Sequence, residues 1–300
     1  MNQKSNTKLI LQKYGFFTKH RLGQNFLVDD DVLEQIAEDA DVNGNDHVLE
    51  IGPGIGSLTK VLCEQAAYVT SVEIDEKLAG ILQEELKEYG NFTLIREDIL
   101  KVDLRRIAAD YPDCTFKVVA NLPYYITTPI ILKLLEAHLP IVSVTIMVQK
   151  EVADRMEAQA GSKAYGSLSL AVQYYAQART TQIVPPEAFL PAPKVSSAVV
   201  HLQRYEKPPV EVRDEKLMFR LIRAGFEQRR KTLVNAIYNT AGTGLSKEEI
   251  VACILAIGEA ETVRGEKLTL EQYARLSDVT GERIKIQEIK KCSDLAEKQM

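Results

Sequence analysis

Short apolar runs and amphipathic segments alternate along the first two thirds of the chain. The apolar runs have the length of buried strands and lie at 47–51, 68–73, 92–95, 117–120 and 142–149. Apolar residues recur at helical spacing over 31–40, 58–67, 77–89 and 129–137. Strands and helices that alternate in this way predict a mostly parallel α/β sheet with helices on both faces. Further elements are expected at 168–175 and 180–184, and the alternating run 195–202 is typical of a closing edge strand.

The pattern changes at Lys207-Pro208-Pro209, beyond which it is helical. Apolar residues keep helical spacing over 214–240. Ser246–Glu249 and Thr269–Gln272 each have the residue types of a capping box, which opens a helix. We therefore expect two domains, an α/β domain over 1–206 and a small all-helical domain over 207–300. The last 15 or so residues are charged and are expected to be frayed.

The composition is that of a soluble globular protein, with 45% hydrophobic and 26% charged residues. No apolar stretch approaches the roughly 18 residues of a membrane span, and the N-terminus lacks the features of a signal peptide. The four cysteines are far apart in the sequence, which favours reduced thiols and a cytoplasmic location. None of the four histidines has a metal ligand at useful spacing, so no metal site is expected.

Positive charge is concentrated in two segments of an acidic chain. The net charge is −5, yet residues 1–28 contain five Lys and Arg residues and no acidic residue, so the remainder carries −10. A second basic cluster extends from Arg220 to Lys231. Such patches can attract an anionic polymer such as a nucleic acid. The alternative for each patch is a solvated tail or helix face.

A glycine-rich loop, 50–56, lies between the first predicted strand and its helix. Its glycines allow a tight turn and close approach of a ligand to the main chain at the carboxyl end of a parallel sheet. The spacing is G-x-G-x-G rather than the dinucleotide fingerprint G-x-G-x-x-G. Glu50 lies at the start of this loop, just before its glycines, and its negative charge disfavours a pyrophosphate. A cationic ligand with a free amino group, such as S-adenosylmethionine, fits this charge better.

Two further acids end the next predicted strands. Glu73 can accept hydrogen bonds from both hydroxyls of a ribose, and Asp98 can accept one from an adenine amino group. Each acid alone has an alternative reading as a surface carboxylate at a strand end. Three acids at successive strand ends around a glycine loop favour a nucleoside-bearing ligand.

The string Asn121-Leu122-Pro123-Tyr124 follows the fourth strand. The Asn121 side-chain oxygen and the Leu122 carbonyl can accept hydrogen bonds, and Pro123 fixes the backbone that carries them. Tyr124 offers a flat face on which a ring can stack. Together these groups suit a planar base with an exocyclic amino group and predict a site for methylation of that nitrogen. The alternative is a Pro-containing turn after a buried strand.

The order of these motifs resembles that of the ribosomal RNA adenine dimethyltransferase family, and most of all its small-subunit type. Two more strings match: the segment 21–27 resembles the family's G-Q-N-F-L motif, and 189–199 resembles its F-x-P-x-P-x-V-x-S-A-V loop. The resemblance covers about residues 14–275. It implies a Rossmann-like S-adenosylmethionine-dependent methyltransferase domain followed by a helical RNA-binding domain.

The resemblance also implies roles for individual residues. The cofactor pocket would be lined by Asn25, Leu27, Gly52, Gly54, Glu73, Asp98 and Asn121. The target adenine would be held by Asn121, Leu122, Pro123 and Tyr124, with Phe189 stacked on its other face. Ribosomal RNA would be contacted by Arg21, Arg223, Arg229, Arg230 and Lys231.

The implied reaction is N6,N6-dimethylation of two adjacent adenines near the 3′ end of small-subunit ribosomal RNA. It would take place on a pre-assembled small subunit (pre-30S), with the protein acting as a monomer. The nearest alternative is a resistance methyltransferase of the Erm type, which modifies one adenine of large-subunit RNA. The others are a non-catalytic assembly or transcription factor of the same ancestry, and a DNA or small-molecule amino methyltransferase. The acceptor string and the long helical C-terminal region favour the small-subunit type.

Overall fold

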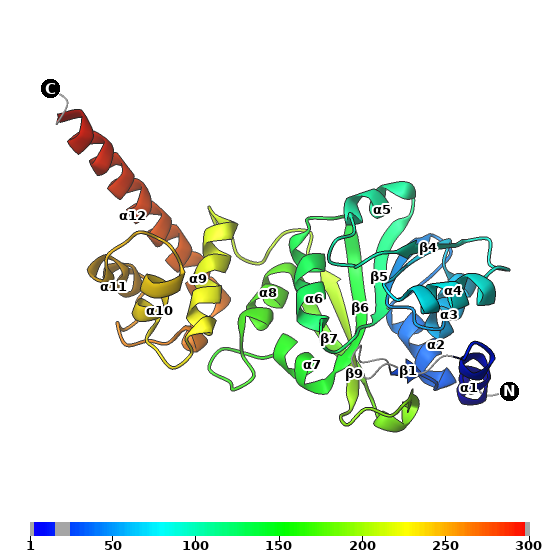
Figure 1. The fold of residues 1–300 in the computed structure, drawn as a ribbon. Helices are drawn as coiled ribbons and strands as arrows, with labels where there is room; N and C mark the ends of the chain where they lie inside the picture. The colour runs from blue at the N-terminus through cyan, green and yellow to red at the C-terminus, as the bar shows by residue number, and fades with distance from the viewer. Residues whose placement is uncertain (1–2, 16–24, 298–300) are drawn as a thin grey trace. The chain divides into compact units, whose positions relative to one another are not determined.

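The computed structural model describes residues 3–15 and 25–297, and the chain forms two compact units (Figure 1). The α/β unit comprises Met1–Asp154 and Ala176–Tyr205, and the helical unit comprises Arg155–Tyr175 and Glu206–Met300. The single boundary expected after residue 206 is therefore corrected, because the chain also enters the helical unit at 155–175. Helix α8 (Ser167–Tyr175) causes this, since its Tyr175 stacks on Phe219 and donates a hydrogen bond to Glu215.

A seven-stranded sheet forms the centre of the α/β unit, with the strand order β4-β3-β2-β5-β6-β9-β7. Five strands are parallel neighbours: β2 (Asp46–Ile51), β3 (Tyr68–Glu73), β4 (Phe92–Arg96), β5 (Thr115–Asn121) and β6 (Ile141–Gln149). Strand β9 (Ser197–Arg204) pairs antiparallel with both β6 and β7 (Ala176–Val184). The expectation that this run forms an edge strand is wrong, because β7 covers its outer side and Ala198, Val199 and Val200 are all buried.

Helices cover both faces of this sheet, as Figure 1 shows. On one side lie α2 (Asp30–Asp39), α3 (Ser57–Gln65) and α4 (Glu76–Glu85), and on the other α5 (Leu104–Asp110) and α6 (Thr127–Glu136). Asp29, Asp75 and Asp103 each accept a backbone N–H of the next helical turn, so three of these helices begin at an Asp N-cap. Apolar residues of α2 and α3 pack with Val48, Val69 and Val119 of the sheet.

Three helices were not expected from the sequence: α1 (Gln3–Lys13), α5 and α7 (Lys150–Met156). Helix α1 packs its Ile10 against Phe26, Ile55 and Leu78. Phe26 belongs to β1 (Phe26–Leu27), which pairs antiparallel with β8 (Phe189–Leu190) after the 3-10 turn Pro186–Ala188. This small sheet pairs Phe26 and Leu27, from the described part of the 21–27 motif, with the first two residues of the 189–199 motif.

The helical unit contains α8, α9 (Glu215–Glu227), α10 (Leu233–Thr240), α11 (Lys247–Ala256), the 3-10 turn η3 (Gly265–Lys267) and α12 (Leu270–Glu297). Both predicted capping boxes are confirmed, since Ser246 and Glu249, and likewise Thr269 and Gln272, exchange side-chain and backbone hydrogen bonds. Gly225 is required where α9 meets η3, because a Cβ there would lie 2.3 Å from the Tyr273 hydroxyl.

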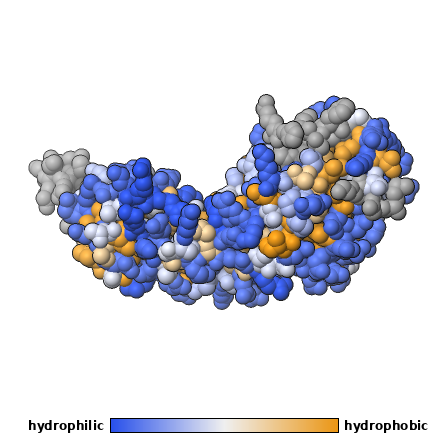
Figure 2. Space-filling view, turned by 90° about the horizontal axis from the view of Figure 1, so that it is seen from below, coloured by the Kyte–Doolittle hydropathy of each residue, from blue (hydrophilic) through white to orange (hydrophobic). Residues whose placement is uncertain are grey.

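Helix α12 continues to Glu297, so the expected fraying of the last 15 residues is corrected up to that point. The stretch after Gly281 contains no Gly or Pro and is rich in Glu and Lys, which suits a helix. Within residues 3–15 and 25–297, no helix combines the length and apolar character that crossing a membrane requires. Polar side chains cover much of the face in Figure 2, and apolar residues gather there in smaller patches.

Candidate functional site

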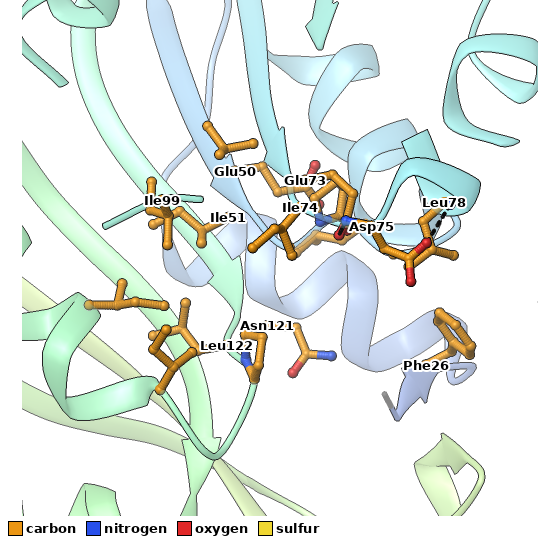
Figure 3. Close-up of a pocket in the computed structure, with 18 of the residues that line it drawn as sticks. Phe26, Glu50, Ile51, Glu73, Ile74, Asp75, Leu78, Ile99, Asn121 and Leu122 are labelled. Carbon is orange, nitrogen blue, oxygen red and sulfur yellow. Dashed lines mark hydrogen bonds between the residues drawn. The ribbon is translucent and has the colours of Figure 1, made fainter. Parts of the chain in front are cut away.

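A cavity of about 340 Å³ opens at the carboxyl ends of β2, β3 and β5. Five segments supply most of its lining: 25–27, 50–55, 72–75, 97–99 and 121–126. These are the segments in which the sequence predicted cofactor and acceptor residues, and the carboxyl edge of the parallel sheet brings them together. The volume is in the range of small-molecule sites, roughly 300–1,000 Å³. In Figure 3, Glu50, Glu73 and Asp75 lie along one side of this cavity, and Asn121 and Leu122 lie along the other.

The glycine loop takes a backbone conformation that L-residues rarely adopt. Gly52, Gly54 and Gly56 have φ angles of 69°, 62° and 86°. A Cβ on Gly54 would lie 3.1 Å from the Phe26 ring, and one on Gly52 would lie 3.6 Å from Cδ of Pro123. The loop therefore keeps its main chain close to both β1 and the acceptor motif.

Three acids of the cavity, Glu50, Glu73 and Asp75, are almost fully buried. Glu73 is 6% exposed, and its Oε1 accepts a hydrogen bond of 2.8 Å from the backbone N–H of Asp75. Burial raises the pKa of Glu73, although backbone N–H groups of Asp75, Gly54 and Ile74 oppose the shift. Glu73 thus lies where the sequence predicted it, next to the glycine loop.

Glu50 is 1% exposed, and its Oε2 accepts hydrogen bonds of 2.7 Å from the hydroxyls of Thr59 and Ser71. Burial raises its pKa to about 7, against the effect of these two hydrogen bonds. The sequence argument treated Glu50 as a full negative charge beside the loop. With a pKa near 7, the group exchanges its proton close to neutral pH, so its charge depends on what occupies the cavity.

Asp98 lies two residues beyond the end of β4, which stops at Arg96. It is half-buried, and its Oδ1 accepts the backbone N–H of Leu100 at 3.0 Å. Asp75 was not singled out from the sequence, yet it lines the cavity and caps α4 with its side chain. Its position two residues after Glu73 was the available signal.

The described lining of the cavity contains five acidic residues and no Lys, Arg or His. The partners named above for Glu50, Glu73 and Asp98 are hydroxyls and backbone N–H groups. The electrostatic character of this cavity therefore favours a ligand that carries positive charge. Among the residues that the structure describes, no group of His, Cys, Asp and Glu side chains has the arrangement of a metal site.

The acceptor motif lies across the cavity from these acids. Asn121 ends β5, and its Nδ2 lies 3.5 Å from the carbonyl of Asn25, at the outer limit of a hydrogen bond. Leu122 is buried and donates its backbone N–H to the carbonyl of Met147 at 3.1 Å. The hydroxyl of Thr127 donates to the Pro123 carbonyl at 3.0 Å, so the turn is tied to the start of α6.

The two aromatic residues expected to sandwich a base are in different environments. Tyr124 is half-buried and lines the cavity, and its hydroxyl lies 2.6 Å from Oγ of Ser197. Burial raises the pKa of Tyr124. Phe189 is only 2% exposed and packs with Leu27, Val184 and Val199 in the core.

Phe189 therefore lies in the core and not among the residues that line the cavity, and its stacking on the base stays a prediction. The pairing of β8 with β1 holds Phe189 in the apolar cluster below that small sheet. Tyr125, which the sequence argument did not use, lines the cavity and is 58% exposed. Its place directly after Tyr124 in the acceptor string was the only available signal.

The basic residues predicted to contact RNA also divide into groups. Arg21 lies outside the described residues. Arg223, Arg230 and Lys231 are exposed. Arg229 instead donates to the carbonyls of Lys163 and Tyr165, at 3.3 and 3.1 Å, and pairs with Glu266 at 3.4 Å.

The guanidinium of Arg229 thus joins the 163–165 segment to η3 while its side chain is 45% exposed, and its role as an RNA contact stays a prediction. Two further exposed residues of α9, Lys216 and Arg220, share a face with Arg223 at helical spacing. The exposed basic face of α9 is thus formed by Lys216, Arg220 and Arg223.

Several known proteins are similar to this chain over most of its length. A family model described as ribosomal RNA adenine dimethylase matches residues 15–279. "Ribosomal RNA small subunit methyltransferase A" of Lachnoclostridium phytofermentans is 52% identical over 278 residues, which are 92% of this chain and 96% of that protein. The protein of the same name from Bacillus pumilus is 49% identical over 276 residues, with 91% and 94% covered.

Two solved structures share the fold. The 23S rRNA methyltransferase ErmE superposes with a TM-score of 0.63 at 27% identity, covering 86% of this chain and 100% of that one. A dimethyladenosine transferase from Plasmodium falciparum superposes with a TM-score of 0.67 at 25% identity, covering 82% and 94%.

Proposed function

The chain belongs to the ribosomal RNA adenine dimethylase family, and from this premise we propose that it dimethylates adenines of small-subunit ribosomal RNA, with S-adenosylmethionine as methyl donor. The observation that carries the proposal is that the acceptor motif 121–124 and the acidic glycine-loop site line one cavity. Two relatives named as small-subunit methyltransferases are 52% and 49% identical over 92% and 91% of the chain, whereas ErmE is 27% identical. These identities favour the small-subunit type over the Erm type.

The residues of the cavity fit this cofactor. S-adenosylmethionine supplies an electrophilic methyl group on a positively charged sulfur and also carries an ammonium group. Five acidic side chains and no cationic ones line the described cavity, so both charges would be favourably placed. Glu73 would accept the ribose hydroxyls, Asp98 would accept the adenine amino group, and Asn25, Leu27, Gly52 and Gly54 would contact the remainder.

The acceptor motif would activate and orient the target base. The N6 lone pair of adenine is delocalised into the ring and is a weak nucleophile. Hydrogen bonds from N6 to the Asn121 side-chain oxygen and the Leu122 carbonyl favour a pyramidal nitrogen with a localised lone pair. Holding that lone pair in line with the methyl group can lower the barrier by several kcal/mol. No general base is required, because N6 becomes acidic once it has accepted the methyl group.

Tyr124 would stack on the base that enters the cavity. Removing a base from its stack costs a few kcal/mol, and stacking on one aromatic side chain returns about 1–3 kcal/mol. Phe189 would have to leave the core to stack on the other face of the base, because its ring is buried in this structure.

The exposed basic face of α9, with Arg230 and Lys231, would bind the RNA backbone. A local basic face on a chain of net charge −5 directs a polyanion to one region of the surface. We further propose that the protein acts as a monomer in the cytoplasm on the pre-assembled small subunit. Its targets there would be two adjacent adenines near the 3′ end of the RNA.

The test is transfer of labelled methyl groups from S-adenosylmethionine to small subunits that lack the modification, in parallel with large-subunit RNA and free adenosine. We expect label on small-subunit RNA alone, recovered as dimethyladenosine. Asn121→Ala should lower turnover by about 1,000-fold while cofactor affinity stays within roughly tenfold, because only the acceptor geometry is lost. Label on large-subunit RNA alone would indicate the Erm type, and no label on any RNA would indicate an assembly factor.

A further inference from the structure

A hydroxyl pair connects the acceptor motif to the 189–199 motif. The Tyr124 Oη and Ser197 Oγ atoms are 2.6 Å apart, a short hydrogen bond in which either group can donate. Ser197 is fully buried as the first residue of β9, whereas Tyr124 lines the cavity. The bond therefore joins a fixed residue of the sheet to a residue that faces the ligand.

The sheet order explains how two residues 73 positions apart meet. Strands β5 and β9 lie on either side of β6, because Asn121 is paired with Met147 and Ser197 with Gln149. Neighbouring strands are about 4.8 Å apart, so β5 and β9 are separated by roughly 10 Å. The Tyr124 side chain, three residues beyond the end of β5, must therefore extend across the carboxyl end of β6 to reach Ser197.

Both ends of the Tyr124 side chain are consequently held. Its backbone belongs to a turn whose carbonyls at Pro123 and Tyr124 accept from the Thr127 hydroxyl, at 3.0 and 3.4 Å. Its hydroxyl is held by Ser197, which pairs with strands on both sides, Gln149 of β6 and Val184 of β7. A ring fixed at its Cβ and at its hydroxyl has a fixed long axis and keeps only rotation about that axis.

We propose that Ser197 is a positioning residue that fixes the direction of the Tyr124 ring axis, and with it the place where the ring lies against the target adenine. This inference rests on the proposed function and adds to it. Tyr124 would touch the base, and Ser197 would act through Tyr124 alone. The orientation of the stacked base determines the direction of its N6 lone pair, so loss of the bond should affect the methyl-transfer step rather than cofactor binding.

The experiment compares Ser197→Ala, Tyr124→Phe and the double variant in the small-subunit methylation assay. Misplacing reacting groups by about 1 Å can cost roughly 100-fold in rate, so we expect each single variant to lose about tenfold or more in kcat. Because both variants remove the same bond, the double variant should lose no more than Tyr124→Phe alone. The cofactor dissociation constant, measured by calorimetry, and the Tm should stay close to wild type.

Two further variants separate the hydrogen bond from packing. Ser197→Cys keeps most of the side-chain volume but hydrogen-bonds weakly, so it should resemble Ser197→Ala in kcat. Ser143→Ala removes a buried serine hydroxyl from β6, six residues before the partner of Ser197 and so roughly 20 Å away along the strand. We expect wild-type kcat for this control.

Each other outcome overturns the inference. Wild-type kcat in Tyr124→Phe shows that the bond is not needed, and this variant leaves the strand intact even if Ser197→Ala does not fold. Additive losses, or a Ser197→Cys variant with wild-type kcat, would assign Ser197 a packing role. Parallel losses of Tm and cofactor affinity would assign it a structural role. A wild-type protein that methylates no RNA overturns the proposed function and this inference together, so the two failures are distinguishable.

Discussion

The sheet of the α/β unit has a cavity lined in part by acidic residues at each end, and these acids have different hydrogen-bond partners at the two ends. At the carboxyl edge, Glu50 and Glu73 are bonded to hydroxyls and backbone N–H groups. At the amino edge, a cavity of about 600 Å³ is also lined by acids, but Lys117, Arg179 and His201 line it as well. There the buried Asp46 is paired with Lys117, whose Nζ lies 3.0 Å from its Oδ2.

The difference indicates which end of the sheet is prepared for a charged ligand. An acid that is paired inside the protein has no need of an external cation. An acid held only by neutral donors in a buried site has a raised pKa and gains from a cation that enters. The carboxyl edge therefore combines the strand-end geometry of a ligand site with an unneutralised negative charge, and the amino edge does not. Four substitutions can break or sharpen this comparison.

The largest effect is expected at the amino edge, for Lys117→Met. This change leaves the buried carboxylate of Asp46 without its cation, which typically costs about 3–5 kcal/mol in the free energy of unfolding. Cofactor affinity should not change, because Lys117 is at the opposite end of the sheet. Urea unfolding at neutral pH measures the first quantity and calorimetry the second.

The matched control for Lys117 is Lys150→Met. Lys150 pairs with Asp154 at 2.8 Å on the surface, where both side chains are about half exposed. An exposed pair contributes about 0–1 kcal/mol, so this variant should keep nearly wild-type stability. If Lys117→Met were equally mild, the amino-edge acids would not depend on internal pairing and the contrast would fail.

The next effect is a pH dependence at the carboxyl edge. Glu50 has a pKa of about 7 in the folded protein, against an ordinary value of 4.5. Between these values the folded state holds a proton that the unfolded chain has lost, so stability falls as pH rises from about 4.5 to about 7. The shift corresponds to about 3 kcal/mol, and no further loss from Glu50 is expected above that range.

Urea unfolding of the cofactor-free protein from pH 5 to 8 measures this slope. Glu73 contributes in the same direction, since burial raises its pKa too. The informative quantity is therefore the difference between wild type and Glu50→Gln, which should lack most of the Glu50 contribution. If stability depended on pH equally in wild type and in Glu50→Gln, the folded protein would not hold an extra proton on Glu50. The contrast with the paired acids of the amino edge would then fail.

A smaller effect is expected for cofactor binding by Glu73→Gln. The amide keeps an acceptor for one ribose hydroxyl but loses the charge and the second acceptor. We expect a dissociation constant about 10- to 100-fold higher, because hydrogen bonds to charged groups contribute about 1.5–3 kcal/mol. Glu84→Gln removes the same charge from an exposed pair with Lys87 and should leave the affinity unchanged. If the two variants bound the cofactor equally well, Glu73 would not be a cofactor-binding residue.

The convergence of the site was predictable because it follows from topology. Gly52, Glu73 and Asn121 are each at or just beyond the end of a parallel strand, and strand ends of one sheet meet at one edge. The sequence therefore identified the cavity lining without any knowledge of packing. The capping boxes were predictable for a different reason, because the two partners of each box are only three residues apart in the sequence.

The features that local sequence patterns did not show depend on contacts between distant segments. Phe189 is buried because β8 pairs with β1, more than 160 positions away, and no local pattern encodes that pairing. The run 195–202 alternates like an edge strand, yet β7 covers its outer side. Arg229 belongs to a basic cluster in the sequence, but carbonyls at 163 and 165 engage it. Each is an override of a local signal by tertiary structure.

Lys133 is a residue of this second kind, and it carries the smallest expected effect. It lies on α6 outside all the motifs, and its Nζ donates to the carbonyls of Ile99 and Val102, both at 2.7 Å. Those carbonyls belong to the loop that carries Asp98 into the cavity, so Lys133 holds the loop against the helix that follows the acceptor motif. Lys133→Met should weaken cofactor binding by about 1 kcal/mol, or several-fold in the dissociation constant. The reason is that cofactor binding would then have to order a loop that Lys133 no longer holds in place.

The control for Lys133 is Lys101→Met, which removes an exposed lysine from the same loop. Both substitutions delete one positive charge near Asp98, but only Lys133→Met frees the two carbonyls. A loss of affinity confined to Lys133→Met would show that loop position matters. Because loss of a nearby positive charge favours a cationic cofactor, a similar gain in affinity in both variants would instead point to long-range charge. In that case the carboxyl edge would respond to any nearby cation, and its lack of internal pairing, rather than its loop geometry, would govern cofactor binding.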